Sequence, residues 1–329
     1  YDGRFPVSRT YGDRSWDGVL SAAEKPVSLN PESGRLWTAN NRVVGGESLA
    51  RLGDGGYDKP ARAARIRDQL ATMENATPAD LLALQLDDGA PSLNRWHELL
   101  LATLTPAITD ENRSLAKLRS RLTDWDGRAR IDSASYPLVR YFRDQVAQRV
   151  FDPIYIYCVQ KYEDFSWRHF NYEPALWTLL QEKPAHLLST QYDSWDGLLV
   201  AAAQGVIEQL DDEGTSVSRA TWGKLNRAKI AHPMARLFPD WLAGWLSMPS
   251  DPLPGDSFTP RVQTPNFGAS ERMVVSPGRE AEGFFHMPTG QSGNPLSPFF
   301  RAGHEAWVHG EPTPFLPSET EHTLVLKPE

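Results

Sequence analysis

The chain contains one cysteine, Cys158, among its 329 residues. No disulfide can therefore form within it, and we expect Cys158 to be a buried thiol on an apolar helix face. Long apolar runs are missing as well. The mean hydropathy is −0.47, and no stretch approaches the roughly 18 apolar residues that identify a membrane-spanning helix. We therefore expect no membrane partner.

Concentrated positive charge is also missing. The chain has 34 Lys and Arg against 42 Asp and Glu, a net charge of −8 with His neutral, and its arginines are scattered along the sequence. Because a nucleic-acid-binding surface needs a concentrated basic patch, we expect no nucleic-acid partner and favour a small molecule.

Metal-binding spacings are lacking too. His304 and His309 flank Glu305, but they form neither the H-E-x-x-H helix nor the three or four converging ligands of a zinc site. Asp87-Asp88 lacks the ligand spacing of a calcium-binding EF-hand loop. We predict no metal and no cofactor in this chain, and we expect the two histidines to lie on a surface or in an interface.

The hydrophobic periodicity changes twice along the chain. Extended patterns near both ends enclose a long helical middle, so the two ends are expected to meet in one sheet system. Outside the glycine-rich C-terminal region, strands are predicted at 16–20, 35–40, 222–232 (strand or hairpin) and 323–326. Helices are predicted at 60–73, 77–86, 93–103, 111–125, 136–162, 172–188 and 195–210. The missing N–H of Pro153 favours a break in the fifth helix, and Pro249–Pro254 is expected to be a surface loop.

The richest stretch of motifs runs from Phe267 to Phe300. A small-residue turn at 267–270 leads into a strand at 272–276, and Pro277-Gly278 ends it before a return strand at 283–287. In Gly290-Gln291-Ser292-Gly293-Asn294-Pro295, two glycines would permit positive φ and a close backbone approach.

Two sequence motifs in this stretch resemble those of a known protein family. Gly-Ala-Ser-x-Arg at 268–272 and Gly-Gln-Ser-Gly-Asn-Pro-x-Ser-Pro at 290–298 resemble the C-terminal signature of the penicillin amidase (penicillin acylase) family of N-terminal nucleophile hydrolases. Other segments of the chain also resemble motifs of this family. They are Trp16-Asp17-Gly18, Asn30–Gly34, Thr38-Ala39-Asn40-Asn41-Arg42, Trp125-Asp126-Gly127 and Thr221–His232. The resemblance covers nearly the whole chain.

The resemblance implies a fold and a division of the chain. The expected fold class is α+β, part of a four-layer αββα core with a large helical insertion. Residues 1–53 would form a β segment of that core, 54–220 the helical insertion, and 221–329 a β-rich return to the core.

It also implies a reaction. Members of the family use a Ser at the start of a processed β chain, whose own α-amino group acts as the base, to hydrolyse linear amides through an acyl-enzyme. A phenol such as Tyr1 cannot perform that chemistry, so we expect the chain to be the C-terminal portion of a β chain, inactive alone, with the nucleophile elsewhere. Its partners would be the rest of the β chain, the α chain and an amide substrate, either a β-lactam side-chain amide or an N-acyl homoserine lactone. The resemblance further implies a periplasmic location and a calcium ion in the complete enzyme.

Three residues are candidates for the site. Arg4, in Asp2-Gly3-Arg4-Phe5-Pro6-Val7, matches the family's run with the active-site arginine, although an arginine at a strand edge would explain it as well. Phe170 and Asn171 lie in an aromatic-rich stretch that could wall an acyl pocket, for which ordinary core packing is the alternative.

Two serine motifs are weaker candidates for a nucleophile. Ser114-Leu115-Ala116-Lys117 fits the S-x-x-K pattern but lacks its companion motifs, so a solvated helix face is preferred. Ser292 falls short of G-x-S-x-G and is predicted to be a turn hydroxyl. A non-catalytic binding or scaffolding relative that keeps the fold is the alternative to an enzyme.

Overall fold

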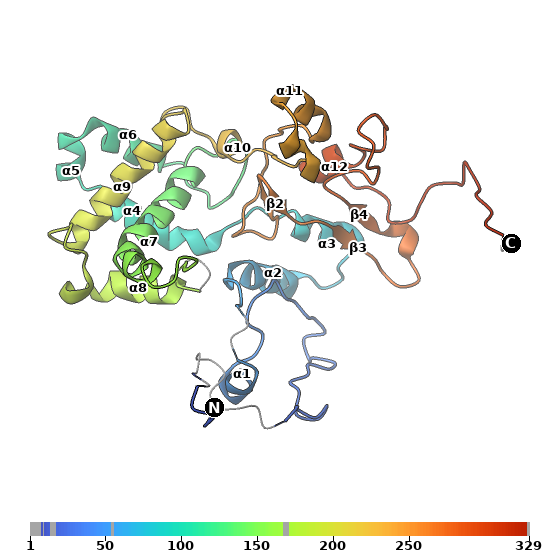
Figure 1. Cartoon of the computed structure of the whole chain (residues 1–329), viewed down its shortest axis with the longest axis horizontal. Coiled ribbons are helices and arrows are strands. Elements are labelled where there is room, and N and C mark those ends of the chain that lie inside the picture. The colour runs from blue at the N-terminus through green and yellow to red at the C-terminus, as the bar shows by residue number, and fades with distance from the viewer. Residues whose placement is uncertain (1–7, 9, 14–17, 54–55, 167–170, 328–329) are drawn as a thin grey trace. The chain divides into compact units, whose positions relative to one another are not determined.

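The computed structural model describes residues 8, 10–13, 18–53, 56–166 and 171–327 (Figure 1). The chain divides into two compact units. Unit 1 takes in 1–72, 90–127 and 134–220, and unit 2 takes in 73–89, 128–133 and 221–329. Both units are therefore built from segments that are discontinuous in sequence.

The described part of unit 1 is helical. Its helices are α1 (Gly46–Leu52), α2 (Ala61–Thr72), η1 (Pro91–Leu93), α4 (Asn94–Thr103), α5 (Pro106–Glu111), α6 (Arg113–Arg121), α7 (Tyr136–Val159), α8 (Glu173–Glu182), η3 (Ala185–Leu187) and α9 (Trp195–Asp212). The helices predicted within 60–73 and 93–210 are confirmed apart from their ends, and α5, which lies between the predicted helices 93–103 and 111–125, was not predicted. α1 was not predicted.

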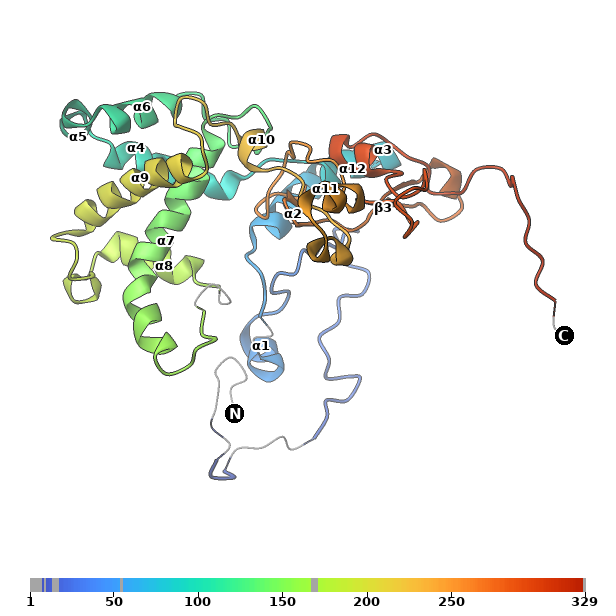
Figure 2. The same ribbon diagram turned by 45° about the horizontal axis from the view of Figure 1, so that its top comes forward.

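The core of unit 1 forms where α7 packs along α9, which lie side by side in Figures 1 and 2. Phe142 and Val146 of α7 and Ala203 and Val206 of α9 are completely buried. Burying one such aromatic or aliphatic side chain contributes about 1.5–3 kcal/mol. Trp96 of α4 packs edge-on against Phe142 with ring centroids 6.4 Å apart, so α4 joins the same core.

The break predicted in α7 is wrong, because the helix continues through Pro153 to Val159. Burial explains where this proline is tolerated. Phe151 is the last buried residue of the helix, and Ile154, Ile156 and Tyr157 beyond it are more than half exposed. Water can therefore satisfy the carbonyl that loses its hydrogen bond to the missing N–H of Pro153. Cys158 is only half-buried, so its predicted burial is also wrong.

Local capping explains where several helices begin. Thr77 and Asp80 form a reciprocal capping box at the start of α3 (Pro78–Gln85). The side chain of Asn112 accepts hydrogen bonds from the first amides of α6, and Ser194 does the same for α9. Each cap satisfies helix-terminal donors that would otherwise be unpaired.

Unit 2 contains α3 and the sheets. Its other elements are α10 (Trp222–Leu225), η4 (Pro233–Leu237), α11 (Asp240–Ala243), η5 (Gly244–Leu246), β1 (Gln263–Thr264), β2 (Phe267–Gly268), β3 (Arg272–Val274), η6 (Glu280–Glu282), β4 (Phe284–His286) and α12 (His304–His309). The strands predicted at 272–276 and 283–287 are confirmed as the antiparallel pair β3–β4, with Met273 opposite Phe285. β1 and β2 form a second antiparallel pair.

Other strand predictions are wrong. The stretch 222–232 begins as the short helix α10 and continues without a ladder, and 267–268 is a strand rather than a turn. Residues 35–40 and 323–326 are irregular. Trp222 and Asn226 explain the first case: their side-chain N–H groups donate to the Gly255 and Leu253 carbonyls, both at 2.8 Å. These hydrogen bonds tie the segment to a neighbouring loop instead of a strand.

The structure therefore shows a mixture of helices and small sheets, consistent with α+β. Residues 249–254 form the predicted loop, but Leu253 within it is completely buried, so the predicted surface position is wrong for that residue. Gly290 makes the predicted close backbone approach, because a Cβ there would lie 1.8 Å from the Phe299 carbonyl oxygen. Gly293 does not, since a Cβ there would have nothing within 4 Å, and neither glycine has positive φ.

Candidate substrate pocket

Asn40 and Asn41 form a tight loop in unit 1. Asn40 adopts a left-handed conformation with φ of 62°, which Asn tolerates better than most residues. Its carbonyl accepts a hydrogen bond from the Asp58 amide at 2.8 Å, while the Asn41 side chain accepts one from the Ala39 amide at 3.0 Å. The family landmark at 38–42 is therefore a loop whose backbone is hydrogen-bonded to residue 58.

Arg62 fixes this loop to the start of α2. Its Nη2 donates to Asn40 Oδ1 at 2.9 Å and to Asp58 Oδ2 at 2.8 Å, and its side chain is 15% exposed. A planar guanidinium can hold both acceptors at once, which an ammonium does less well. The loop, Asp58 and α2 thus form one connected group.

A second charged group surrounds Glu173 at the start of α8. Glu173 Oε1 accepts hydrogen bonds from Arg95 Nη2 at 2.7 Å and Trp96 Nε1 at 2.9 Å. Glu173 Oε2 accepts one from Arg143 Nε at 2.9 Å. Arg143 is almost completely buried and also donates to Asp144 at 2.8 Å. Glu173 therefore joins α4, α7 and α8.

Burial and ion pairing both shift pKa values in this region. Burial by itself would raise the pKa of Glu173, but the charge of Arg143 and hydrogen bonds from Arg143, Trp96 and Arg95 lower it below its ordinary value. Burial lowers the pKa of Lys59, and the charges of Arg143 and Arg140 lower it further. The Glu173 shift therefore reflects its pairing with Arg143, and the Lys59 shift reflects burial first and the arginine charges second.

The two groups meet at a pocket of about 580 Å³ within unit 1. Its lining combines charged, amide and aromatic side chains from the loop, α4 and α8: Arg42, Tyr57, Asp58, Pro60, Arg95, Asn171, Glu173, Pro174 and Trp177. Arg95 lies over the Trp177 ring, 4.4 Å from its centroid. A concave site with apolar walls and a few converging polar groups is typical of small-molecule binding.

One predicted site residue lines this pocket. Asn171 does so, and its side chain is exposed. Arg4 and Phe170 lie outside the described residues, so their predicted roles stay predictions. Sequence reasoning missed Arg42, Arg95 and Glu173. The Thr38–Arg42 landmark was the available signal for Arg42, whereas nothing in the local sequence indicates that Arg95 and Glu173 meet.

The serine predictions that the structure addresses agree with it. Ser114 and Lys117 are exposed on α6, as expected of a solvated helix face. Ser292 Oγ accepts a hydrogen bond from the Asn294 amide at 3.2 Å, the bond expected of a turn hydroxyl.

The histidine prediction is half wrong. His309 is exposed, but His304 is buried within unit 2, where it forms a hydrogen bond with the Pro288 carbonyl at 2.7 Å. Among the described residues, no group of three or more His, Cys, Asp or Glu side chains is placed to hold a metal ion. Within the same residues, no helix is both long and apolar enough to cross a membrane.

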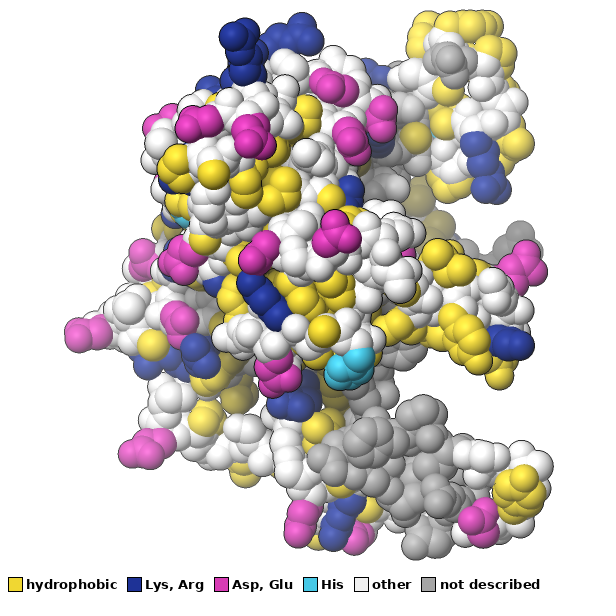
Figure 3. Space-filling model, turned by 90° about the vertical axis from the view of Figure 1, so that its left-hand side faces the viewer, with side chains coloured by type: hydrophobic (Ala, Val, Ile, Leu, Met, Phe, Trp, Pro, Cys, Tyr) yellow, Lys and Arg dark blue, Asp and Glu magenta, His cyan; other side chains and the backbone are white. Residues whose placement is uncertain are grey.

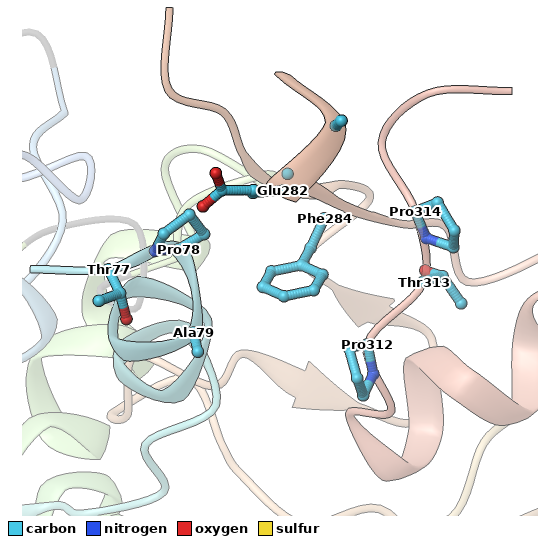
Figure 4. A pocket seen from close by; sticks show the side chains of 10 residues that line it. Thr77, Pro78, Ala79, Glu282, Phe284, Pro312, Thr313 and Pro314 are labelled. Atoms are coloured by element: carbon cyan, nitrogen blue, oxygen red, sulfur yellow. The ribbon is translucent and has the colours of Figure 1, made fainter. Parts of the chain in front are cut away.

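Unit 2 has a separate pocket of about 530 Å³ (Figure 4). Phe284 projects into it between Pro78 at the start of α3 and Pro312 on the opposite side. Its lining contains no cation, and its carboxylate, Glu282, is paired with Arg279. It therefore lacks the converging polar groups found beside Glu173.

Charges of both signs are interspersed on the molecular face in Figure 3, where Lys and Arg alternate with Asp and Glu among apolar side chains. This face presents no concentrated basic patch.

Comparison with known proteins identifies the chain's relatives. It is 26% identical over 334 residues to the penicillin acylase 2 proenzyme of Pseudomonas sp. (strain SE83), covering 96% of this chain and 40% of that protein. It is 24% identical over 349 residues to the acyl-homoserine lactone acylase QuiP of Pseudomonas aeruginosa, and 26% identical over 341 residues to QuiP of Pseudomonas putida. Each QuiP alignment covers 94% of this chain and 40% of the relative.

This chain thus spans about 40% of the length of these relatives. The sequence profile of penicillin amidase matches residues 1–323, which is nearly all of the chain and includes every motif on which the resemblance was based. The chain therefore belongs to the penicillin amidase family.

Proposed function

We propose that this chain is the C-terminal part of the β chain of an acylase that hydrolyses linear amides. The observation that carries the proposal is the family match over residues 1–323, together with relatives named as penicillin acylase and acyl-homoserine lactone acylase. Their names support two substrate classes, β-lactam side-chain amides and N-acyl homoserine lactones.

The proposed reaction proceeds through an acyl-enzyme. A Ser hydroxyl at the start of the β chain, outside residues 1–329, attacks the amide carbonyl, and its own α-amino group accepts the proton. The amine leaves, and water then hydrolyses the acyl ester. This chain would contribute the pocket beside Glu173, including Asn171, for substrate binding. Arg4 would help to position the polar groups around the nucleophile.

The proposed partners are the remainder of the β chain and the α chain of one precursor. The word proenzyme in the name of one relative supports such processing. A periplasmic location and a calcium ion elsewhere in the complete enzyme remain part of the proposal.

The test uses the complete protein and this chain side by side. Both are incubated with a chromogenic phenylacetyl anilide and a long-chain acyl anilide. We expect turnover by the complete protein and none by residues 1–329 alone, because the nucleophile and its amine are elsewhere. Turnover by the isolated chain that Ser292→Ala abolishes would contradict the assignment of the nucleophile. A correctly processed complete protein without amidase activity on any acyl amide would favour the non-catalytic alternative.

A further inference from the structure

Two accessible arginines line the pocket beside Glu173. Arg42 is exposed and forms no ion pair with any residue that the structure describes. The Arg95 side chain remains 37% exposed and uses one nitrogen, Nη2, for its hydrogen bond to Glu173. Because a guanidinium carries five N–H donors, Arg95 retains donors beyond that bond.

The two carboxylates that line the pocket are already bound by arginines that lie outside the lining. Both oxygens of Glu173 accept hydrogen bonds, and its strongest partner, Arg143, is not part of the lining. Asp58 is held by Arg62, which also lies outside the lining. Each acid thus has a cation outside the pocket, so Arg42 and the N–H groups of Arg95 that do not bind Glu173 remain available to a ligand.

The rest of the lining suits the apolar part of a ligand. Trp177 is half-buried beneath Arg95, and Pro60 and Pro174 add rigid apolar surface. Asn171 contributes an exposed amide. A ligand with an apolar body and one negative group would satisfy both parts of this lining, whereas a wholly neutral ligand would leave the guanidinium groups to water.

We propose that Arg42 and Arg95 bind a carboxylate of the substrate, so that the complete protein prefers amides that are anionic at neutral pH over neutral amides of the same shape. Guanidinium and carboxylate groups match in geometry and form strong charge-assisted hydrogen bonds. The inference rests on the proposed acylase function and favours substrates with a carboxylate, such as penicillins, over uncharged acyl homoserine lactones.

Two matched substrate pairs test the preference and locate the carboxylate. N-Glutaryl-4-nitroanilide and N-pentanoyl-4-nitroanilide differ by a carboxylate on the acyl side, and benzylpenicillin and its methyl ester differ by one on the amine side. We expect kcat/KM of the complete protein to be at least about tenfold higher for the anionic member of one pair. The pair that responds shows which part of the substrate enters the pocket.

Variants connect the preference to the pocket. Arg42→Gln and Arg95→Gln should each reduce the preference at least about fivefold, mainly through KM. Arg67→Gln removes an exposed arginine of α2 that is not in the lining, and it should leave the preference unchanged. Circular dichroism checks the fold of the Arg95 variant. Arg42 is exposed and has no ion pair with a described residue, so its substitution is the less disruptive of the two. Raising the salt concentration should weaken the effect of Arg42, because exposed charges are screened.

Several outcomes would overturn the inference. Equal kcat/KM within both pairs would do so, as would a preference that survives both arginine substitutions. If the complete protein hydrolyses nothing, the proposed function fails, and calorimetric titration with pentanoate and with the neutral pentanamide decides the inference separately. Pentanoate binding that Arg42→Gln weakens would support the carboxylate site, and equal affinities for the acid and the amide would reject it.

Discussion

Glu173 shows how single residues hold unit 1 together. Its carboxylate joins three helices by accepting hydrogen bonds from Arg95, Trp96 and Arg143. Removing one member of a buried ion pair typically costs about 3–5 kcal/mol, because the remaining charge is left without compensation. The same carboxylate borders the candidate pocket, so stability and ligand binding share one residue.

The pH dependence of stability should report this carboxylate. Its folded pKa is lowered from an ordinary value of 4.5, so folding favours the ionised form. The resulting stabilisation is fully present above pH 4.5 and is lost as the pH falls through the lower folded value. We expect Glu173→Gln to lower the thermal midpoint of the chain at pH 7, and the difference from the wild type to shrink below pH 4.5. Glu98→Gln, an exposed change on α4, is the control. A difference that stays constant from pH 7 to 3 would contradict the role of Glu173.

Arg4 carries the residue-scale prediction for catalysis. In the complete, self-processed enzyme, Arg4→Lys should lower kcat/KM at least about tenfold, roughly 1.4 kcal/mol of transition-state stabilisation, because an ammonium cannot reproduce the planar donor fork. Circular dichroism should be unchanged. Arg9→Lys and Arg14→Lys, outside the motif, are the controls, and equal small effects at all three positions would remove Arg4 from the site.

At the scale of elements, caps and close backbone approaches decide where segments begin and turn. The Gly290–Pro295 turn contains two glycines of different structural importance. Gly290 faces backbone atoms of Phe299, whereas Gly293 faces open space. Backbone atoms cannot rotate away as a flexible side chain can, so only Gly290 is sterically required.

This difference gives a matched pair of substitutions. We expect Gly290→Ala to destabilise the chain by about 1–3 kcal/mol, the usual range for overpacking. Gly293→Ala should be neutral or stabilising by about 0.4–1 kcal/mol, because it reduces the conformational entropy of the unfolded chain. Chemical denaturation of both variants measures the difference. Equal destabilisation by the two alanines would mean that the turn has another conformation.

At the scale of the whole molecule, both units are assembled from distant segments. Residues 73–89 belong to unit 2 although they lie between segments of unit 1. Within them, Leu82 and Leu84 of α3 are buried, and Gln85 donates to the Met273 carbonyl of β3 at 3.0 Å. Unit 2 therefore depends on α3, which lies more than a hundred residues before the segment 221–329 that makes up most of this unit.

A truncation should expose this dependence. A piece of residues 1–220 retains α3 without β3, so Leu82 and Leu84 lose their cover. We expect it to bind a hydrophobic dye and to unfold over a broad range, unlike the full chain, because unsatisfied apolar surface weakens cooperative packing. Cooperative unfolding of a soluble 1–220 piece would show that residues 221–329 are not needed, and it would also defeat the predicted sheet system shared by the two ends.

The sequence by itself determined features that depend on neighbours in the chain. Periodicity located the helices, and the positions of glycine and proline placed β3 and β4. Motifs in the right order identified the family, which the profile match confirms. These signals work because their physical causes act over a few residues.

Tertiary structure alone decided what depends on distant partners. Trp222 and Asn226 donate to loop carbonyls about 30 residues away, which overrides the strand pattern of their own segment. Pro153 remains inside α7 because that end of the helix faces water. Arg95 and Glu173 are separated by 78 residues, and no local pattern predicts that they share a pocket. Long-range hydrogen bonds, burial and charge pairing are properties of the assembled chain, and they alone place Arg42, Arg95 and Asn171 around one cavity.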